Sequence, residues 1–385
     1  MRIRKPEYYD RFQCIGGACS DSCCIGWEID IDEEKAKLYR QAQGDLGERM
    51  KRCIDWNEGH FILQGKEERC PFLNKENLCD LILELGEDSL CDICREHPRY
   101  YDWHDGLAEV GVGLCCEAAG RLILEKEEPA GFVVEEAAES EKTVESEEGA
   151  SFEADSELLE TLFSARETAF AILQNREISI WDRLWRFIDY AEELQEMLDF
   201  GILEEVRETV EYYREHPAGE SEDELAEEPE DEAVGESEES DVCTETSRQK
   251  AEVYSGILEL CRRLEPINES WPEMLNSLEA LAGRPEFLAK TETRLDGAVK
   301  ARDYEYEHLA VYFVYRYFMK CRFDGDIRSK AALVLFCLQL IRLLDIETFR
   351  KQGSLTMEDR VQNAKFCSKE IEYSEENLEL LAEAC

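Results

Sequence analysis

The residues best suited to chemistry are cysteines gathered near the N-terminus. Eleven of the 17 cysteines lie within the first 116 residues of this 385-residue chain. Eight of these eleven lie in the run CIGGACSDSCC at residues 14–24 and in the segments CPFLNKENLC and CDIC that follow. Cys91 and Cys94 form a C-x-x-C motif. A tight turn at such a motif lets both thiolates bind the same metal ion. Thiolate ligands suit tetrahedral zinc or an iron–sulfur cluster, and the spacing alone leaves both open.

We therefore predict a cysteine-ligated metal centre in this region. Cys19 and Cys23 are one helical turn apart, and we expect them to share a centre with Cys91 and Cys94. Because adjacent side chains diverge, one of Cys23 and Cys24 should serve a second centre or none. The candidate metal ligands are Cys14, Cys19, Cys23, Cys24, Cys70, Cys79, Cys91, Cys94 and Cys115.

The other cysteines are not assigned to metal. Cys53 and Cys116 stay outside the ligand set, although Cys116 adjoins a candidate ligand. Six cysteines are isolated in the rest of the chain, and we expect them to fill apolar cores as small hydrophobic side chains. These are Cys243, Cys261, Cys321, Cys337, Cys367 and Cys385.

The net charge of the chain limits the classes of partner that it can bind. With 90 acidic and 44 basic residues the formal net charge is −46, which argues against binding to nucleic acid, because phosphate contacts rely on Lys and Arg. A positively charged partner face fits better. The acid is concentrated in residues 125–157 and 215–247, which hold 13 and 15 acidic residues. Both segments are of low complexity, and we predict that they are mostly disordered.

Targeting signals are not evident. The basic N-terminus MRIRKPEYYDRFQC lacks the apolar stretch of a secretory signal. The longest apolar run, Ala331–Leu338, is far shorter than the roughly 20 residues that span a bilayer. We expect a cytoplasmic protein without a membrane span, and in that reducing compartment dense cysteines favour metal binding or redox chemistry over disulfides.

The elements around the cysteines are short and mixed. Alternating apolar and polar residues predict strands at 27–32, 60–64 and 107–113. Short helices are predicted at 32–40 and 81–86. Such a small, irregular domain is better explained by a bound metal than by a layered sheet.

The rest of the chain has helical periodicity. Apolar residues recur at three- and four-residue spacing over 156–175 and 179–200, the second with Ser179 as N-cap and Gly201 as stop. The aromatic stretch HLAVYFVYRYF is interpreted as a buried core helix. Further helices are predicted at 253–264, 271–282, 304–321 and 327–344.

The predicted fold class is therefore mainly α. A small, irregular, metal-bound cysteine-rich domain with short strands is followed by a helical domain. The predicted parts are a cysteine-rich metal-binding domain at 1–124, an acidic linker at 125–157, a helical segment at 158–214, an acidic insertion at 215–247 and a helical domain at 248–385.

Common catalytic motifs do not occur. The chain has no G-x-x-x-x-G-K-[ST], H-E-x-x-H or G-x-S-x-G, and no glycine-rich turn of the dinucleotide-binding type. The motif inventory alone therefore names no reaction.

The cysteine-rich sequence nevertheless resembles a known family. The runs PEYYDRFQCIGGACSDSCCIGWEIDID, CPFLNKENLCDLILELGEDSLCDICREHPR and GLCCEAAGRLIL are similar to the flagellin lysine-N-methylase family. This part is also similar to a broader group of small zinc- or iron-chelating proteins. The resemblance extends to LFSARETAFAILQNREISIWDRL and to the aromatic helix, and skips the acidic segments. The family usually has Pro where this chain has Cys116.

The resemblance implies an enzyme that transfers methyl groups from S-adenosylmethionine to lysine ε-amines of flagellin. It also favours a [4Fe-4S] cluster over zinc. Catalytic and cofactor-binding residues are not identified by the sequence; Trp27, Glu28, Tyr100 and Tyr101 lie beside the cysteine motifs as candidates for an amine acceptor or an aromatic wall. The alternative is a non-enzymatic iron–sulfur or zinc protein with a redox or interaction role.

Overall fold

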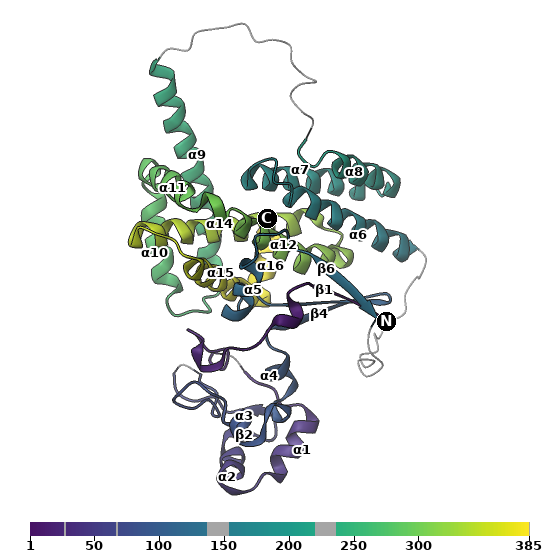
Figure 1. Cartoon of the computed structure of the whole chain (residues 1–385), viewed down its shortest axis with the longest axis vertical. Coiled ribbons are helices and arrows are strands. Elements are labelled where there is room, and N and C mark those ends of the chain that lie inside the picture. Colours follow the sequence, from purple (N-terminus) through teal and green to yellow (C-terminus); the bar gives the residue numbers. More distant parts are fainter. Residues whose placement is uncertain (27, 67, 137–153, 220–235, 385) are drawn as a thin grey trace. The chain divides into compact units, whose positions relative to one another are not determined.

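The computed structural model describes residues 1–26, 28–66, 68–136, 154–219 and 236–384. The chain divides into two compact units (Figure 1). Unit 1 comprises Met1–Leu122 and Phe132–Lys142, and unit 2 comprises Ile123–Gly131 and Thr143–Cys385. The chain thus leaves unit 1, returns to it with one further strand, and then completes unit 2.

Unit 1 contains a four-stranded sheet made of β1 (Arg2–Pro6), β4 (Arg99–His104), β5 (Leu107–Val112) and β6 (Phe132–Glu136). The strand order is β4-β5-β1-β6, with β1 parallel to β5 and antiparallel to β6. An Asp-Gly turn joins β4 to β5, and its glycine, Gly106, has φ +72°. Two-residue hairpin turns of this kind require positive φ, which glycine adopts at little cost.

The cysteine-rich part of unit 1 lies between β1 and β4 in sequence and consists of short elements. These are η1 (Tyr9–Arg11), η2 (Gly16–Ala18), α1 (Glu33–Gln41), α2 (Gly44–Cys53), β2 (Ile54–Asp55), β3 (His60–Phe61), α3 (Asp80–Leu85), η3 (Glu87–Ser89) and α4 (Asp92–Glu96), and α5 (Glu117–Leu124) follows the sheet. Their core mixes apolar side chains such as Met50 and Phe72 with the buried thiols of Cys70 and Cys91. Sulfur is therefore part of the packing of this core.

Among the described residues of unit 2, all regular elements are helices. Its helices are α6 (Ala154–Leu173), α7 (Ile180–Asp199), α8 (Leu203–Glu215), α9 (Glu236–Arg263), α10 (Trp271–Ala282), α11 (Pro285–Val299), α12 (Tyr304–Tyr317), α13 (Cys321–Asp324), α14 (Ile327–Gln352), α15 (Met357–Glu372) and α16 (Glu375–Ala384), with 3-10 turns η6 (Lys300–Arg302) and η7 (Phe318–Lys320). The central helix, α14, packs against α7, α9, α11, α12, α15 and α16. Both α12 and α14 are buried on nearly every face, and their buried faces include charged side chains such as Glu307 and Arg342 as well as apolar ones.

Local signals set the helix ends of unit 2. The Ser179 hydroxyl accepts a hydrogen bond from the Asp182 N–H at 3.2 Å, and the helix ends before Gly201, whose φ is +70°. Asp326 caps the start of α14 in the same way, and Gly353 follows its end with φ +79°. Caps of this type satisfy backbone groups that a helix cannot pair internally.

The predicted fold class is confirmed as a mainly helical chain with an irregular, cysteine-rich N-terminal part that contains short strands. The strand predicted at 107–113 corresponds to β5, and the one at 60–64 is reduced to the two residues of β3. The strand predicted at 27–32 differs more, because the structure has only an isolated bridge between Asp30 and His60 there. Trp27 lies outside the described residues.

The acidic segments also differ from the prediction where they are described. Residues 132–136 of the predicted linker 125–157 form β6, because FVV pairs in register with β1. The predicted insertion 215–247 contains the start of α9 at Glu236. The other parts of the two segments lie largely outside the described residues.

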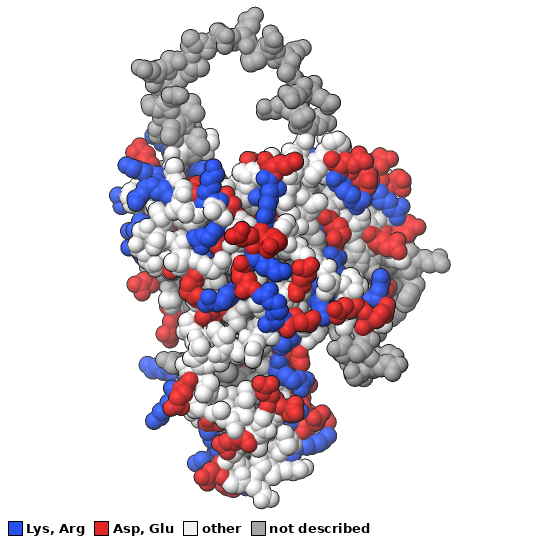
Figure 2. Space-filling model, viewed as in Figure 1, with Lys and Arg blue, Asp and Glu red and all other residues white. Residues whose placement is uncertain are grey.

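One face of the molecule shows how its surface charges are distributed. On the face drawn in Figure 2, acidic and basic side chains are interspersed. Such a mixed surface gives weak long-range attraction for either sign, so local features matter more for recognition than the net charge of −46 does.

Candidate metal centre and anion pocket

Six thiols lie in or against the core of the cysteine-rich part of unit 1, Cys53 among them. We call the other five, whose charges act on one another, the interior thiol cluster. They are Cys24, Cys70, Cys79, Cys91 and Cys94. The Cys70 N–H donates to the Cys24 carbonyl at 2.8 Å, which joins two segments far apart in sequence. Cys79 and Cys91 directly precede α3 and α4, and a bridge pairs Cys79 with Leu73.

Burial controls the electrostatics of this cluster. Cys91 is fully buried and Cys70 is 6% exposed, and the remaining three thiols are half-buried. Burial raises the pKa of Cys70 to about 12 and also raises the pKa of Cys79, because it disfavours the thiolate. A hydrogen bond from the Cys94 thiol lowers the pKa of Cys91 and raises that of its donor.

A second set of thiols lies nearer the surface, and we call it the outer thiol group. It consists of Cys14, Cys19, Cys23 and Cys116, of which Cys14 and Cys23 are exposed. The Cys23 thiol donates a hydrogen bond to the sulfur of Cys24, and this bond lowers the pKa of Cys24 to about 7. The two sets therefore meet at adjacent residues.

This grouping differs from the one expected from the sequence. The Cys23 thiol hydrogen-bonds to Cys24, and the charges of Cys14 and Cys116 also raise its pKa; the Cys94 thiol hydrogen-bonds to Cys91, and the charges of Cys24 and Cys70 also raise its pKa. The predicted pairing of Cys19 and Cys23 with Cys91 and Cys94 assumed a helical turn, but residues 19–23 form bends and turns.

Neither set of thiols is arranged with the geometry of a metal site. Within the residues that the structure describes, no group of three or more His, Cys, Asp or Glu side chains is placed to hold a metal ion as it stands. The thiols instead hydrogen-bond in pairs, Cys23 with Cys24 and Cys91 with Cys94. Metal binding removes thiol protons and draws the sulfurs to about 2.3 Å from zinc, so these pairs would have to rearrange.

The remaining cysteines have different surroundings. Cys115 is half-buried, and Cys53 accepts a hydrogen bond from Gln64 at 3.8 Å. Cys243 and Cys385 lie outside the residues whose side chains are described. The isolated cysteines described in unit 2 are buried among helices, as expected for core thiols: Cys261, Cys321, Cys337 and Cys367.

The three described candidates for an amine acceptor, Glu28, Tyr100 and Tyr101, are not brought together. Tyr100 lies against Gly111 on one face of the sheet, whereas the Tyr101 hydroxyl on the other face donates to Glu96 at 2.6 Å. Glu28 lies 3.7 Å from His60 instead of facing either tyrosine. These side chains therefore do not form a common amine site.

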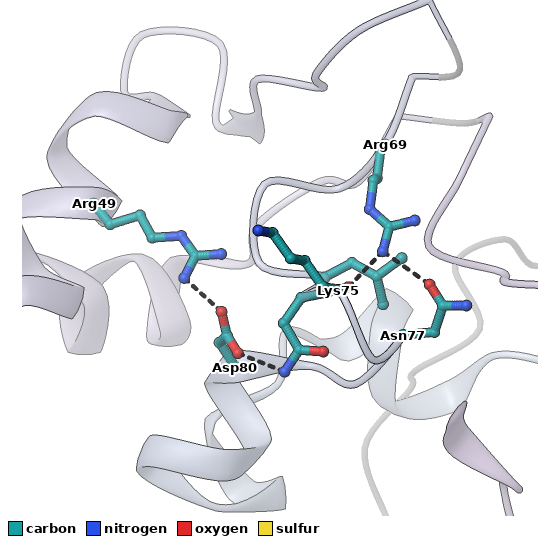
Figure 3. Close-up of a pocket in the computed structure, with 7 residues that line it drawn as sticks. Arg49, Arg69, Lys75, Asn77 and Asp80 are labelled. Carbon is teal, nitrogen blue, oxygen red and sulfur yellow. Dashed lines mark hydrogen bonds and ion pairs between the residues drawn. The ribbon is translucent and has the colours of Figure 1, made fainter. Parts of the chain in front are cut away.

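Beside the interior thiol cluster lies an open pocket of about 510 Å³. It is lined by Arg49, Arg69, Leu73, Asn74, Lys75, Asn77 and Asp80, of which most belong to the loop between Cys70 and Cys79 (Figure 3). This size lies within the range of small-molecule sites. The loop thus contributes residues both to the pocket and to the thiol cluster.

The pocket is positively charged overall. Asp80 pairs with Arg49 at 2.5 Å, while Arg69 uses one nitrogen, Nη2, to reach the Asn77 side chain at 2.8 Å. Lys75 extends between Arg49 and Arg69 and makes no hydrogen bond or ion pair with a residue that the structure describes (Figure 3). Lys75 and the rest of the Arg69 guanidinium are thus available to an anion such as a carboxylate.

Sequence reasoning missed this pocket and did not predict the surroundings of Cys116. The available signal was a pair of basic residues, Arg69 and Lys75, beside a cysteine motif in an acidic chain. Arg49 comes from α2 and reaches the pocket only through the fold. For Cys116 the only indication in the sequence was that it adjoins Cys115. Adjacency does not show which of the two thiols faces the N-terminal loop.

Comparison with known proteins places the chain in a family. Residues 166–385, more than half of the chain, match the FliB lysine N-methylase C-terminal domain. The chain belongs to the FliB lysine N-methylase family. The resemblance inferred from the cysteine motifs is thereby confirmed. The residues that match the family model lie in the helical unit 2.

Relatives share part of the chain at modest identity. The flagellar biosynthetic protein FliU of Salmonella muenchen is 28% identical over 133 residues, which cover 32% of this chain and 78% of that protein. The lysine-N-methylases of Salmonella typhimurium LT2 and Salmonella choleraesuis SC-B67 are 28% and 27% identical over the same length, with 33% of each covered. The match thus spans about a third of the length of these two enzymes. No solved structure matches the chain.

The structure also bears on membrane association. None of the helices in the described ranges combines the length and apolar character needed to cross a bilayer. The long helices that are most apolar, such as α14, carry buried charged residues, Arg342 and Asp345 among them.

Proposed function

We propose that this protein is an S-adenosylmethionine-dependent methyltransferase that modifies lysine ε-amines of flagellin, and that it works in the cytoplasm. The family match over residues 166–385 carries this proposal. The similarity to a protein named flagellar biosynthetic protein and to lysine-N-methylases supports both the reaction and a flagellar substrate.

The reaction places clear demands on the site. S-adenosylmethionine supplies a methyl group on a positively charged sulfur, and the lysine nitrogen attacks this carbon as the carbon–sulfur electron pair returns to sulfur. The amine must be neutral when it attacks and releases a proton afterwards. The protein therefore has to bind the cofactor in line with the lysine and accept that proton.

We further propose that the interior thiol cluster holds a [4Fe-4S] cluster, with zinc as the alternative. The donor set fits, because a [4Fe-4S] cluster takes four cysteine ligands and the interior set provides Cys24, Cys70, Cys79, Cys91 and Cys94. Bound there, the group would supply a redox-active centre tuned by burial, whereas zinc would only close the fold. The buried Cys70 and Cys91 are the thiols best shielded from solvent.

The pocket supports a place for the cofactor's amino-acid end. Lys75 and Arg69 offer two cations to a carboxylate, and Arg69 stands beside the interior thiol cluster because it pairs with Ile25, next to Cys24. Asp80 keeps Arg49 in place and lowers the net positive charge of the pocket. We propose that the carboxylate of S-adenosylmethionine binds here.

The reaction is tested with the full chain, purified without oxygen, mixed with S-adenosylmethionine and flagellin. We expect flagellin to gain mass in steps of one methylene group, on peptides that contain lysine. An absence of mass gain by a protein that carries its metal would reject the enzyme and favour the non-enzymatic metal protein.

The pocket is tested in the same assay. Lys75→Ala should raise the KM for S-adenosylmethionine about tenfold, the loss of one charged contact of about 1.4 kcal/mol, with little change in kcat. Lys51→Ala removes an exposed lysine of α2 that pairs with the exposed Glu48, and should change neither constant. Equal effects of the two substitutions would show that the pocket has no special role.

A further inference from the structure

Two helix connections of unit 2 are held against each other by one side chain. The α7–α8 turn comprises residues 200–202, and α13 with the turn that follows it comprises residues 321–326. The Nε2 of the buried Gln195 donates to the Gly325 carbonyl at 3.0 Å and to the Asp199 carboxylate at 2.8 Å. Its Oε1 accepts the first N–H of α14 at 2.7 Å. The end of α7 and the start of α14 are therefore neighbours.

Each of these connections exposes a phenylalanine. Phe200 is 75% exposed and Phe323 is 77% exposed, the two largest values among the large apolar side chains of the described residues. Ile202, in the same turn as Phe200, is 39% exposed. A phenyl ring left in water contributes little to folding, whereas aromatic side chains often carry much of the binding energy of an interface. Exposed apolar side chains on neighbouring turns therefore indicate an interaction surface.

The helical hairpin that carries Phe200 is strongly acidic. Residues 187–206 form most of α7, the turn and the start of α8, and contain seven acidic residues and no Lys or Arg. Glu192 pairs with Arg328 at 2.6 Å, and another of the seven pairs with an arginine of α8 at 3.4 Å. Glu196 and Glu205 are exposed and form no ion pair with a residue that the structure describes. The hairpin thus keeps negative charge that is not neutralised.

The connection before α14 adds carboxylates of its own. Asp324 pairs with Lys330, and Asp326 caps α14 by accepting a backbone N–H at 2.9 Å. The guanidinium of Arg322 lies 4.9 Å from the centre of the Phe323 ring. Acidic residues still outnumber basic ones around the two connections, so this face attracts a positively charged partner.

We infer that this face docks a segment of flagellin that carries both lysine and apolar side chains. Apolar side chains of that segment cover Phe200, Ile202 and Phe323, and its lysines lie against the exposed carboxylates. A lysine cation can also bind over the face of a phenyl ring. The identity of the partner rests on the proposed function, whereas the chemistry that recognises it rests on the exposed phenylalanines and the acidic hairpin.

The apolar contacts are tested by direct binding. The Kd of flagellin for the full chain is measured by calorimetry without S-adenosylmethionine. We expect Phe200→Ser and Phe323→Ser each to raise the Kd about tenfold, because truncating an aromatic anchor of an interface has effects of this size. Trp185→Ser is the matched control, since Trp185 is 52% exposed on the same helix but lies about four turns before Phe200. It should leave the Kd unchanged, and an unaltered unfolding midpoint shows that each variant is folded.

The charge is tested by reversing exposed acids. Glu196→Lys combined with Glu205→Lys should raise the Kd about tenfold at low salt and less at high salt, because salt screens exposed charges. Glu259→Lys combined with Glu273→Lys makes the same change of net charge on exposed residues of α9 and α10 and should have little effect. A peptide of alternating leucine and lysine should compete with flagellin, and a leucine–glutamate peptide of equal length should not.

Failure of docking and failure of methyl transfer give different results. If both phenylalanine variants bind and methylate flagellin as the unaltered chain does, the docking face is wrong and the proposed function stands. If flagellin binds through the phenylalanines but gains no methyl group, the reverse holds. Equal weakening by Trp185→Ser, or equal competition by the two peptides, would also overturn the docking face. A dimeric chain that becomes monomeric on Phe200→Ser would assign the face to a second copy instead.

Discussion

The buried cysteines of the two units are the same chemical group in different surroundings. In unit 2, Cys367 is enclosed by long helices and lies only 3.9 Å from the Cys337 carbonyl, as part of an apolar core. In unit 1, Cys91 is equally buried, but other thiols surround it and the neighbouring elements are helices of five or six residues. Burial alone therefore does not distinguish a thiol that fills a core from a thiol that binds metal. The presence of other thiols nearby does.

Some helix starts show the same contrast, although α1 of unit 1 is capped by Asp32 and α8, α10, α11 and α12 of unit 2 have no side-chain cap. In unit 2, α7, α14 and α15 start at residues whose side chains accept a backbone hydrogen bond. In unit 1, α3 and α4 start after Cys79 and Cys91, whose side chains make no such bond. Isolated helices this short are unstable in water. We conclude that unit 2 is held by its own packing and caps, whereas the cysteine-rich part of unit 1 relies on what its thiols bind.

The largest effect should come from Cys91→Ser. Serine is a better N-cap than cysteine, so a purely local role would leave α4 as stable or more stable. We expect instead that the interior metal is lost and that unit 1 becomes sensitive to protease while unit 2 stays resistant, because structural metal binding contributes roughly 10 kcal/mol or more to folding. Metal analysis and the mapped cleavage sites measure both effects.

The matched control is Cys53→Ser, in the same unit but outside the interior thiol cluster. Its sulfur accepts a hydrogen bond from Gln64, which a serine hydroxyl can also accept. This variant should keep the metal. Equal metal loss in the two variants would mean that unit 1 tolerates no cysteine substitution, and the proposed distinction between ligands and other thiols would fail.

The sequence predicts what depends on local signals. Ser179 and Gly201 mark both ends of α7 correctly, because caps and stops act within a few residues. The strand β1, RIRKP, has no alternating apolar pattern and exists because β5 and β6 pair with it from distant positions. Similarly, the choice of Cys116 as a neighbour of Cys23 depends on where α5 starts, which spacing does not reveal.

A second prediction breaks the packing of unit 2 without touching a thiol. Arg360 is fully buried between the carboxylates of Glu305 and Asp345, at 3.4 and 2.8 Å, and its guanidinium lies 3.9 Å from the centre of the Tyr306 ring. Burial raises the pKa of both carboxyl groups, so each depends on the guanidinium to stay ionised. Arg360→Met should destabilise unit 2 by about 3–5 kcal/mol, since it removes the buried cation that both acids share. Glu305 is then left with Arg302, and Asp345 with two neutral hydrogen-bond donors.

The metal content of unit 1 serves as the control for this variant, and chemical denaturation followed by circular dichroism measures the loss. Combining Arg360→Met with Asp345→Asn should recover part of the stability, because an amide costs less to bury unpaired than a carboxylate does. A loss of metal on Arg360→Met would contradict the view that the two units are stabilised independently.

A smaller effect is expected from Cys367→Ala. This substitution removes a fully buried thiol from an apolar site, which should cost about 1–2 kcal/mol through lost packing and leave the metal content unchanged. Thermal unfolding and metal analysis on the same sample check both parts. Metal loss here would place a ligand in unit 2 and remove the distinction drawn between the two kinds of buried thiol.

The smallest effect tests the caps themselves. The Thr356 hydroxyl accepts a hydrogen bond from the Asp359 N–H at 3.2 Å, and the Asp359 carboxylate accepts one from the Thr356 N–H at 2.8 Å. Thr356→Ala should lower the stability of unit 2 by about 1 kcal/mol, and Thr356→Ser should retain it, because serine caps equally well. Neither should alter metal content. If Thr356→Ala had no effect on unfolding, caps would not explain why the helices of unit 2 form without metal, and packing alone would have to account for the contrast with α3 and α4.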